Sequence, residues 1–140
     1  CRAAFEALKA SGEGCILSIT ATLGERGAPL QAHAGAAKAG IDALTRHLAV
    51  EWGPFGIRTM SIAPGPVDDT EGIRRLLPDT LRERLVASIP LRRMGTCEEI
   101  AELAVFLASE GGRWMTGTAV VIDGGQRLAG PDWLSTLDEP

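Results

Sequence analysis

The hydrophobic pattern of the chain consists of short apolar runs separated by stripes with helical spacing. The runs at residues 15–20, 56–63 and 118–125 are typical of strands that are buried on both faces of a sheet. Between the first two runs, residues 31–52 predict the longest helix, because apolar side chains recur there at spacings of three and four. The side chains expected on its buried face are Ala37, Ile41, Leu44, Leu48 and Trp52.

Further helices are predicted at the start of the chain and in its second half. Residues 1–11 follow a helical pattern that stops at Gly12, and residues 68–94 predict one or two short helices with loops. Thr96 and Glu99 have the spacing of a capping box, which predicts the start of another helix. Four apolar side chains share one face of that helix: Ile100, Leu103, Ala104 and Leu107.

The order of the predicted elements is helix, strand, helix, strand, helices, strand. Such alternation favours an α/β fold in which helices cover both faces of a parallel sheet. Open doubly wound sheets commonly have about six strands, so three strands predict half of such a sheet. The chain also starts in mid-helix, without an initiator methionine. We therefore expect residues 1–140 to be part of a single domain, with residues 126–140 forming a surface loop.

The amino-acid composition argues against several classes of function. The 140 residues carry a net charge of −4, which argues against a nucleic-acid surface. No apolar run approaches the length of about 18 residues that would imply a membrane span. The three cysteines and two histidines lack the spacing of metal ligands, so no metal site is predicted. The chain contains no tyrosine, so it cannot by itself carry a mechanism that needs one.

Four features, in order, resemble one enzyme family. They are "ILSIT" at residues 16–20, Lys38 on the helix that follows, "HLAVEWGPFGIRTMSIAPGPV" at 47–67, and "IPLRRMGTCEEIAELAVFLASEGGRWMTGTAVVIDGG" at 89–125. Together they resemble the C-terminal half of the short-chain dehydrogenase/reductase family, over residues 5–128. The resemblance implies a Rossmann-like doubly wound fold and a nicotinamide cofactor. The family's Gly-rich phosphate loop would lie upstream of Cys1, so the half that binds the dinucleotide phosphates is expected to be absent.

The catalytic hydroxyl groups of that family are missing. In the family, a tyrosine four residues before the lysine donates a proton to a carbonyl oxygen, and a serine thirteen residues before that tyrosine helps to hold the substrate. Here these positions are Ala34 and Ala21, which argues against ketone and alcohol chemistry. Enoyl-thioester reductases of the family place their tyrosine seven residues before the lysine, where this chain has Gln31.

One branch of the family, the 2,4-dienoyl-CoA reductases, lacks this tyrosine. Its peroxisomal type is similar to this chain in "ITATLGERG", "QAHAGAAK", "HLAVEWGP" and "APGPVDDTEGIRRL". The mitochondrial type has a tyrosine in the loop after the strand, where Leu23 stands here, so the peroxisomal type or a bacterial relative is favoured. The resemblance implies NADPH-dependent reduction of 2,4-dienoyl-CoA thioesters to 3-enoyl-CoA in the β-oxidation of unsaturated fatty acids.

The same resemblance implies the site residues. Lys38 is expected to hydrogen-bond the nicotinamide ribose hydroxyls and is the one residue of this chain assigned to catalysis. The loop after the second strand is expected beside the cofactor: Pro64, Gly65, Pro66, Val67, Asp68, Asp69 and Thr70. Arg75 is expected to bind the substrate, because arginine suits the phosphates of CoA. The proton donor is expected to be an aspartate upstream of this chain, so none is assigned here.

Two other interpretations stay open. One is a related short-chain reductase that acts on another acyl thioester or carbonyl, and the other is a non-catalytic fragment that contributes only a subunit interface. Family members often assemble through the helix that carries the lysine and through the last strand, which implies a homo-oligomer, either a tetramer or a dimer. The residues that select NADPH over NADH would lie in the absent half. The resemblance implies a peroxisomal or cytoplasmic enzyme, although the ending "DEP" is not an S-K-L signal.

Overall fold

The fold is built on a parallel sheet of three strands. The computed structural model describes residues 1–68, 70, 71, 73 and 79–129. Within them the strands are β1 (Cys15–Ile19), β2 (Arg58–Pro64) and β3 (Ala119–Ile122), in the order β1-β2-β3. Ile16 pairs with Thr59, and Ile62 pairs with Val120. The sequence-based prediction of an α/β fold with a parallel sheet is confirmed.

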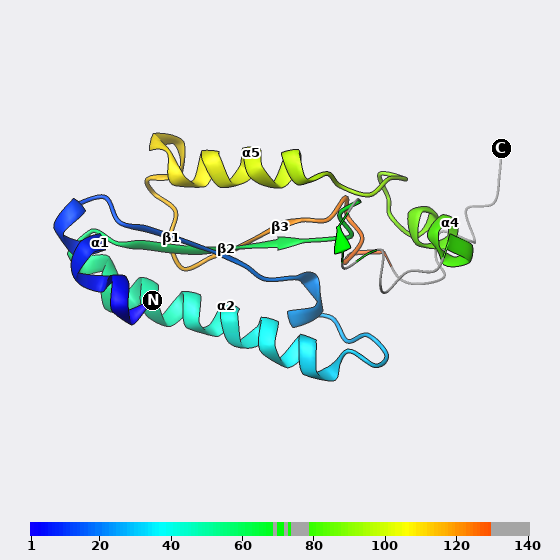
Figure 1. Cartoon of the computed structure of the whole chain (residues 1–140), viewed down its shortest axis with the longest axis horizontal. Coiled ribbons are helices and arrows are strands. Elements are labelled where there is room, and N and C mark those ends of the chain that lie inside the picture. The colour runs from blue at the N-terminus through cyan, green and yellow to red at the C-terminus, as the bar shows by residue number, and fades with distance from the viewer. Residues whose placement is uncertain (69, 72, 74–78, 130–140) are drawn as a thin grey trace.

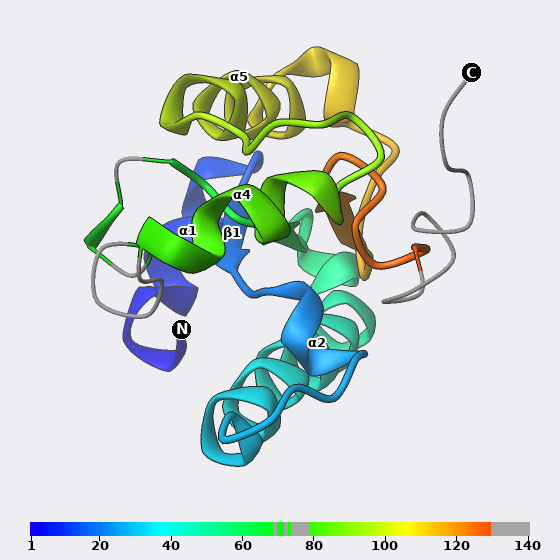
Figure 2. The same ribbon diagram turned by 90° about the vertical axis from the view of Figure 1, so that its right-hand side faces the viewer.

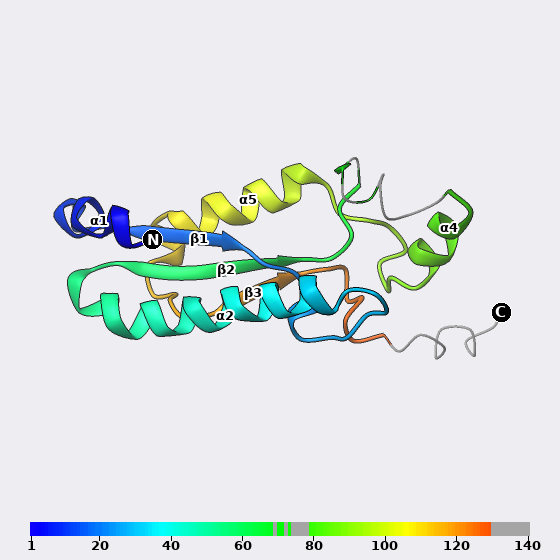
Figure 3. The same ribbon diagram turned by 60° about the horizontal axis from the view of Figure 1, so that its bottom comes forward.

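Helices lie on both sides of this sheet. They are α1 (Phe5–Ser11), α2 (Ala32–Trp52), α4 (Asp79–Ala87) and α5 (Cys97–Ala108), with short 3-10 turns at η1 (Arg2–Ala4), η2 (Thr22–Gly24), η3 (Gly53–Phe55) and η4 (Glu110–Gly112). α2 covers one face and α5 the opposite face (Figures 1 and 2). α4 lies beyond the carboxyl ends of the strands (Figure 3). Because α2 and α5 run antiparallel to the strands, both helices begin near that same end (Figure 1).

The hydrophobic core lies between the sheet and α5. Met60, Ile62 and Leu107 are fully buried at its centre. The partly buried side chains packed around them are Cys15, Leu17, Ile100, Leu103, Ala104, Met115, Val120 and Ile122. The apolar face expected for α5 is therefore confirmed. So is its capping box, in which the Thr96 hydroxyl accepts from the Glu99 amide at 3.2 Å and the Glu99 carboxylate accepts from the Thr96 amide at 2.9 Å.

The face that α2 turns to the sheet differs from the expected one. Ala37 is exposed, and Leu44 keeps 48% of its surface in solvent. The buried residues of α2 are instead Asp42, Thr45 and Leu48. The expected apolar face is wrong at Ala37 and Leu44 because the strands supply polar partners to the buried side: the Thr59 hydroxyl on β2, for example, donates to the Thr45 main-chain oxygen at 2.8 Å.

The third strand is shorter than its apolar run suggested. The sequence predicted a strand over residues 118–125, whereas β3 ends at Ile122 and a tight turn follows. Gly124 and Gly125 have φ of 62° and 86°, a backbone region that glycine enters without steric cost. The Asp123 carboxylate accepts from the amides of Gly125 and Arg127, each at 2.8 Å, and so stabilises this turn.

Candidate active site

The candidate site lies at the carboxyl ends of β1 and β2, where ligands bind in open α/β sheets. Lys38, in the second turn of α2, is half-buried there. Its Nζ donates to the main-chain oxygen of Ile19, the last residue of β1, at 2.9 Å. An ammonium group has three N–H donors, and the described part of the chain uses one of them. The other two suit hydroxyl acceptors such as those of a ribose.

Alanine stands at the two positions where the resemblance places the hydroxyl-bearing residues of a ketone reductase. Ala34 lies one helical turn before Lys38 and is half-buried. Ala21 follows the end of β1 in an extended conformation and is also half-buried. Alanine carries no proton to donate, so neither position can act as a general acid.

The loop after β2 is held against the end of β3. The Gly65 amide donates to the Ile122 main-chain oxygen at 2.9 Å. A Cβ added at Gly65 would lie 2.8 Å from the Cα of Asp123, a separation that folded proteins do not tolerate. The family resemblance places Gly65 in the loop expected beside the cofactor. The structure gives a second reason for this glycine, which is its backbone contact with Asp123.

Val67 and Asp68 are held by a second segment of the chain, the residues that precede α5. The Asp68 amide donates to the Gly95 main-chain oxygen at 2.9 Å, and the Gly95 amide donates back to Pro66 at 3.0 Å. Val67 and Gly95 thereby form an isolated parallel bridge. The Asp68 carboxylate accepts from Arg82 of α4 at 2.5 Å, so this charge is paired within the chain.

Thr70, the last described residue of the expected cofactor loop, turns its hydroxyl inward on the loop. It donates to the Val67 main-chain oxygen at 2.9 Å and accepts from the Ile73 amide at 3.3 Å. Asp69 and Arg75 lie outside the described residues. The structure thus brings Lys38, Pro64 to Asp68, and Thr70 to one end of the sheet, and the cofactor and substrate roles of all the expected site residues stay predictions.

Sequence reasoning missed a buried carboxylate beside Lys38. Asp42, one helical turn further along α2, is only 8% exposed. Its oxygens accept from the Ser61 hydroxyl at 2.7 Å and from the Thr20 hydroxyl at 3.2 Å. The available signal was an acidic residue next to Ile41 within an apolar stripe, which a search for apolar faces passes over.

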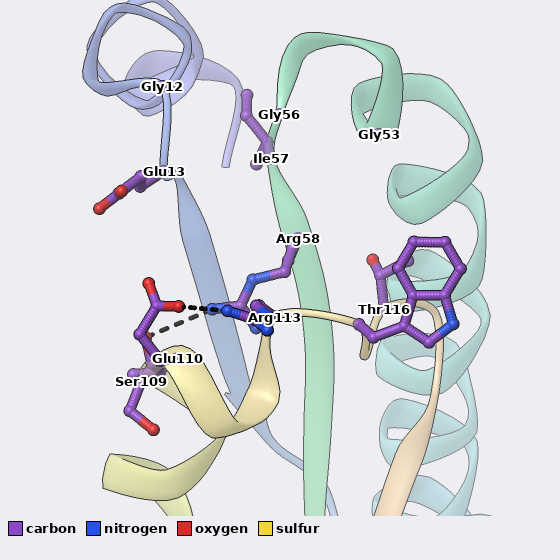
Figure 4. Close-up of a pocket in the computed structure, with 12 residues that line it drawn as sticks. Gly12, Glu13, Gly53, Gly56, Ile57, Arg58, Ser109, Glu110, Arg113 and Thr116 are labelled. Carbon is purple, nitrogen blue, oxygen red and sulfur yellow. Dashed lines mark hydrogen bonds and ion pairs between the residues drawn. The ribbon is translucent and has the colours of Figure 1, made fainter.

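Two hollows lie at opposite ends of the sheet. One of about 320 Å³ is lined by the segment after β1, from Thr22 to Pro29, together with Ser88, Gln126 and Ala129. The other, of about 630 Å³, lies at the amino-terminal ends of the strands and is lined by Arg58, Arg113 and Trp114 among others (Figure 4). Arg58 donates there to the main-chain oxygens of Leu107 and Gly112, at 2.7 and 2.9 Å, and so holds the end of α5. We therefore assign Arg58 a structural role and place the candidate site at the other end of the sheet.

An ion pair that shifts the pKa values of both its partners lies outside this site, at the start of α5. The Glu99 carboxylate accepts from the Arg93 guanidinium at 2.5 and 2.9 Å. These bonds, together with the bond from the Thr96 amide, lower the pKa of Glu99 to about 2. The same pairing raises the pKa of Arg93. The pair reinforces the capping box that starts α5.

Two further observations concern metals and membranes. Across the residues that the structure describes, no three His, Cys, Asp or Glu side chains are grouped so as to hold a metal ion. In the same part of the chain, no helix combines the length and the apolar character needed to cross a bilayer.

The comparison with protein families agrees with this geometry. The family profile described as enoyl-(acyl carrier protein) reductase matches residues 1–127. The chain belongs to the short-chain dehydrogenase/reductase family. Solved structures of that family are similar in fold. A short-chain dehydrogenase from Bacillus anthracis superimposes with a TM-score of 0.81 at 41% identity, covering 89% of this chain and 49% of that one.

A second solved structure that is similar to this chain contains a nicotinamide cofactor. A mutant of 4-hydroxyisoleucine dehydrogenase, solved with NADH and succinate, superimposes on this chain with a TM-score of 0.82 at 31% identity. That superposition covers 89% of this chain and 52% of the dehydrogenase. Reductases and dehydrogenases of this family use nicotinamide cofactors, which is the coarse cofactor class that the sequence analysis expected.

Curated relatives of this short-chain dehydrogenase/reductase chain are 2,4-dienoyl-CoA reductases. The peroxisomal (3E)-enoyl-CoA-producing enzyme of Pongo abelii is 51% identical over 125 residues, which is 89% of this chain and 43% of the relative. The corresponding enzyme of Saccharomyces cerevisiae is 49% identical, over 89% of this chain and 42% of the relative. A probable (2E)-enoyl-CoA-producing reductase of Bacillus subtilis is 46% identical, over 83% and 46%. The chain therefore spans less than half the length of these relatives.

Proposed function

We propose that this chain forms the C-terminal half of an NADPH-dependent reductase that converts 2,4-dienoyl-CoA thioesters to 3-enoyl-CoA during the β-oxidation of unsaturated fatty acids. The observation that carries the proposal is Lys38 at the carboxyl end of β1, with alanine at the two positions where the family has its proton-donating tyrosine and its substrate-holding serine. The identity of about one half to peroxisomal 2,4-dienoyl-CoA reductases supports the substrate class.

The missing acid is compatible with dienoyl reduction because of where the charge develops. A reduced nicotinamide supplies a hydride when bound. The far end of the conjugated diene accepts this hydride, so negative charge spreads along the chain to the thioester oxygen, where hydrogen-bond donors stabilise it. A proton from the acid expected upstream of this chain then adds to the carbon next to the thioester carbonyl, and this leaves the 3-enoyl product. Ketone reduction instead concentrates the charge on one oxygen and needs a nearby proton donor, which Ala34 and Ala21 do not provide.

Lys38 is proposed to orient the cofactor. Its ammonium group is anchored to Ile19 at 2.9 Å and keeps two N–H donors for the nicotinamide ribose hydroxyls. The loop from Pro64 to Thr70 is proposed to approach the nicotinamide ring, since it leaves the adjacent strand at the same end of the sheet. Asp69 in this loop and Arg75 at the CoA phosphates complete the proposed site.

Assembly and location are further parts of the proposal. α2 exposes Ala37 and Leu44, which are seven residues apart and so share one side of the helix, and this gives α2 an apolar surface suited to a second copy of the chain. We therefore propose a homo-oligomer, a dimer or tetramer. The peroxisomal relatives support a peroxisomal location, with the cytoplasm as the alternative.

A chimera tests the proposed function. This chain would replace its matching segment in the Pongo abelii reductase, and NADPH oxidation would be followed with 2,4-dienoyl-CoA. The proposal expects turnover and a 3-enoyl-CoA product by mass spectrometry and NMR. A 2-enoyl product would instead favour the type of reductase found in Bacillus subtilis. Folded chimera without turnover would favour a non-catalytic chain, and turnover of other carbonyl compounds alone would favour a different short-chain reductase.

A further inference from the structure

The buried carboxylate of Asp42, one helical turn after Lys38, links α2 to β2 and to the end of the β1 segment. Asp42 accepts from the Ser61 hydroxyl of β2 at 2.7 Å and from the Thr20 hydroxyl, just past β1, at 3.2 Å. Ser61 is fully buried, and Thr20 is nearly so. Asp42 stands four residues after Lys38, so the two side chains lie on the same side of the helix.

Burying a carboxylate is costly unless hydrogen bonds replace its water shell. Two hydroxyl donors serve Asp42, and no salt bridge to a cation compensates its charge among the described residues. An apolar side chain would fill this position without a desolvation cost. The carboxylate instead sets the orientation of α2, because its two oxygens bond to residues of both strand segments at once.

The same contacts define the place of Lys38. The Thr20 hydroxyl lies 3.2 Å from the Lys38 main-chain oxygen as well as 3.2 Å from the Asp42 carboxylate. The Thr20 amide donates to Ile62 of β2 at 2.8 Å, which extends the pairing of the two strands. The Lys38 side chain then reaches the oxygen of Ile19, the residue before Thr20. Main chain and side chain of the lysine are thus both tied to the last residues of the β1 segment.

The turn after β1 packs closely against this junction. A Cβ added at Gly24 would lie 3.0 Å from the Ala39 amide nitrogen and 3.2 Å from both the Lys38 carbonyl carbon and the Asp42 carboxylate. Glycine allows η2 to approach the helix at the turn that runs from Lys38 to Asp42. The main chain of α2 at Lys38 therefore has little room to shift towards η2.

We propose that Asp42 is a positioning residue for Lys38, acting through Thr20 and Ser61 to set the height of the lysine over the strand ends. The proposal rests on the proposed role of Lys38 at the cofactor. A lysine side chain is long and flexible, so the placement of its ammonium group depends on where its helical turn sits. A shift of about 1 Å in a group that orients a reactant can cost about a hundredfold in rate.

The test uses the chimera with three substitutions at the junction. Asp42→Ala removes both acceptors, Thr20→Val removes one donor at nearly constant shape, and Asp42→Asn keeps an acceptor and the shape of the side chain. We expect Asp42→Ala to lower both the affinity for NADPH, measured by cofactor fluorescence, and kcat/KM, each by about tenfold. Thr20→Val should act in the same direction. Asp42→Asn should restore binding and kcat/KM to within about threefold of the unsubstituted chimera.

A double-mutant cycle with Lys38→Ala separates positioning from simple stabilisation. If Asp42 acts through the lysine, then Asp42→Ala and Thr20→Val should each change NADPH binding by less than about twofold once Lys38 is gone. Equal effects of these substitutions with and without the lysine would overturn the proposal. Thr20→Val keeps the test available if Asp42→Ala does not fold.

Thr59→Val is the matched control. It removes a buried bond from β2 to the same helix, the 2.8 Å bond to Thr45, nearer the amino-terminal end of the strand. It should lower the unfolding temperature and leave NADPH affinity unchanged, whereas an affinity loss equal to that of Thr20→Val would contradict the proposal. Inactivity of the unsubstituted chimera would reject the proposed function instead, and the NADPH-binding cycle would still test the role of Asp42.

Discussion

Lys38 on α2 donates its Nζ proton to the main-chain oxygen of Ile19, at the end of β1, across 2.9 Å. This bond places a cation at the carboxyl end of the sheet, while alanine stands at the family's tyrosine and serine positions. Under the proposed function, this lysine holds the cofactor ribose and takes no part in proton transfer, which would give it a purpose without the family's tyrosine.

Removing the lysine should therefore affect the cofactor first. In the chimera, Lys38→Ala should reduce kcat/KM with 2,4-dienoyl-CoA at least about tenfold, because the nicotinamide loses an orienting contact. The control is Lys9→Ala, which removes the other lysine of the chain, on α1 beside Phe55. Steady-state kinetics would measure both variants, and equal kinetics for Lys38→Ala and the unsubstituted chimera would contradict the assignment.

Arg75→Ala should distinguish binding of the CoA group from binding of the acyl chain. Loss of a charged hydrogen bond costs about 1.5–3 kcal/mol, so KM for a dienoyl-CoA should rise about tenfold or more. The same acyl group on a short thiol carrier lacks the CoA phosphates, and its KM should stay nearly constant. Arg113→Ala, at the opposite end of the sheet, is the control. Equal increases in KM for the two thioesters would remove Arg75 from the CoA site.

The apolar pattern predicted α5 and its buried face because that helix contacts the core through hydrophobic side chains alone, and the capping box marked its start. The same method placed α2 correctly along the chain but misassigned part of its buried face. The strands contact this helix through Thr59, Ser61 and the adjoining Thr20, so its inner side combines the polar Asp42 and Thr45 with the apolar Leu48. Hydrophobic periodicity cannot reveal a face whose partners are hydroxyl groups, and Asp42 was missed for that reason.

Only those site residues were predictable whose side-chain type alone decides what chemistry they can perform. Lys38 and the two alanines were identified through the resemblance to the family, and the structure ties Lys38 to Ile19 at the end of β1, with Ala21 two residues further along the chain. Contacts between distant segments could not be found in this way. The pairing of Asp68 with Arg82 and the approach of Gly65 to Asp123 depend on how α4 and β3 pack against the loop after β2.

The contact between Gly65 and Asp123 leads to a stability prediction. Gly65→Ala should lower the free energy of unfolding by about 1–3 kcal/mol, because the new Cβ would force the β2 loop away from the end of β3. Gly27→Ala is the control, since a Cβ there meets nothing within 4 Å. Urea unfolding of the chimera measures both. A Gly65→Ala protein as stable as Gly27→Ala would show that the loop does not depend on this contact.

The pairing at the start of α5 should make part of the stability depend on pH. Because the pKa of Glu99 is about 2 in the folded chain and its ordinary value is 4.5, the contribution is complete above pH 4.5. It is lost as the pH falls from 4.5 towards 2. Glu99→Gln should therefore lower the unfolding temperature at pH 7 and flatten its decline between pH 5 and 3, and Glu98→Gln, which removes a negative charge from the same helical turn, is the matched control. Parallel curves for Glu99→Gln and the unsubstituted protein would contradict this.

The most direct test of the central claim compares two substrates of equal acyl length in the chimera. With NADPH, kcat/KM for 2,4-dienoyl-CoA should exceed that for the 3-ketoacyl-CoA by about a hundredfold or more, because a general acid contributes about 10²–10⁴ to ketone reduction and this chain provides none at Ala21 or Ala34. Competition between the two thioesters, followed by mass spectrometry of the products, gives the ratio in one reaction. Formation of 3-enoyl-CoA with the ketone left unreduced is the predicted result, and ketone reduction at a comparable rate would contradict the account.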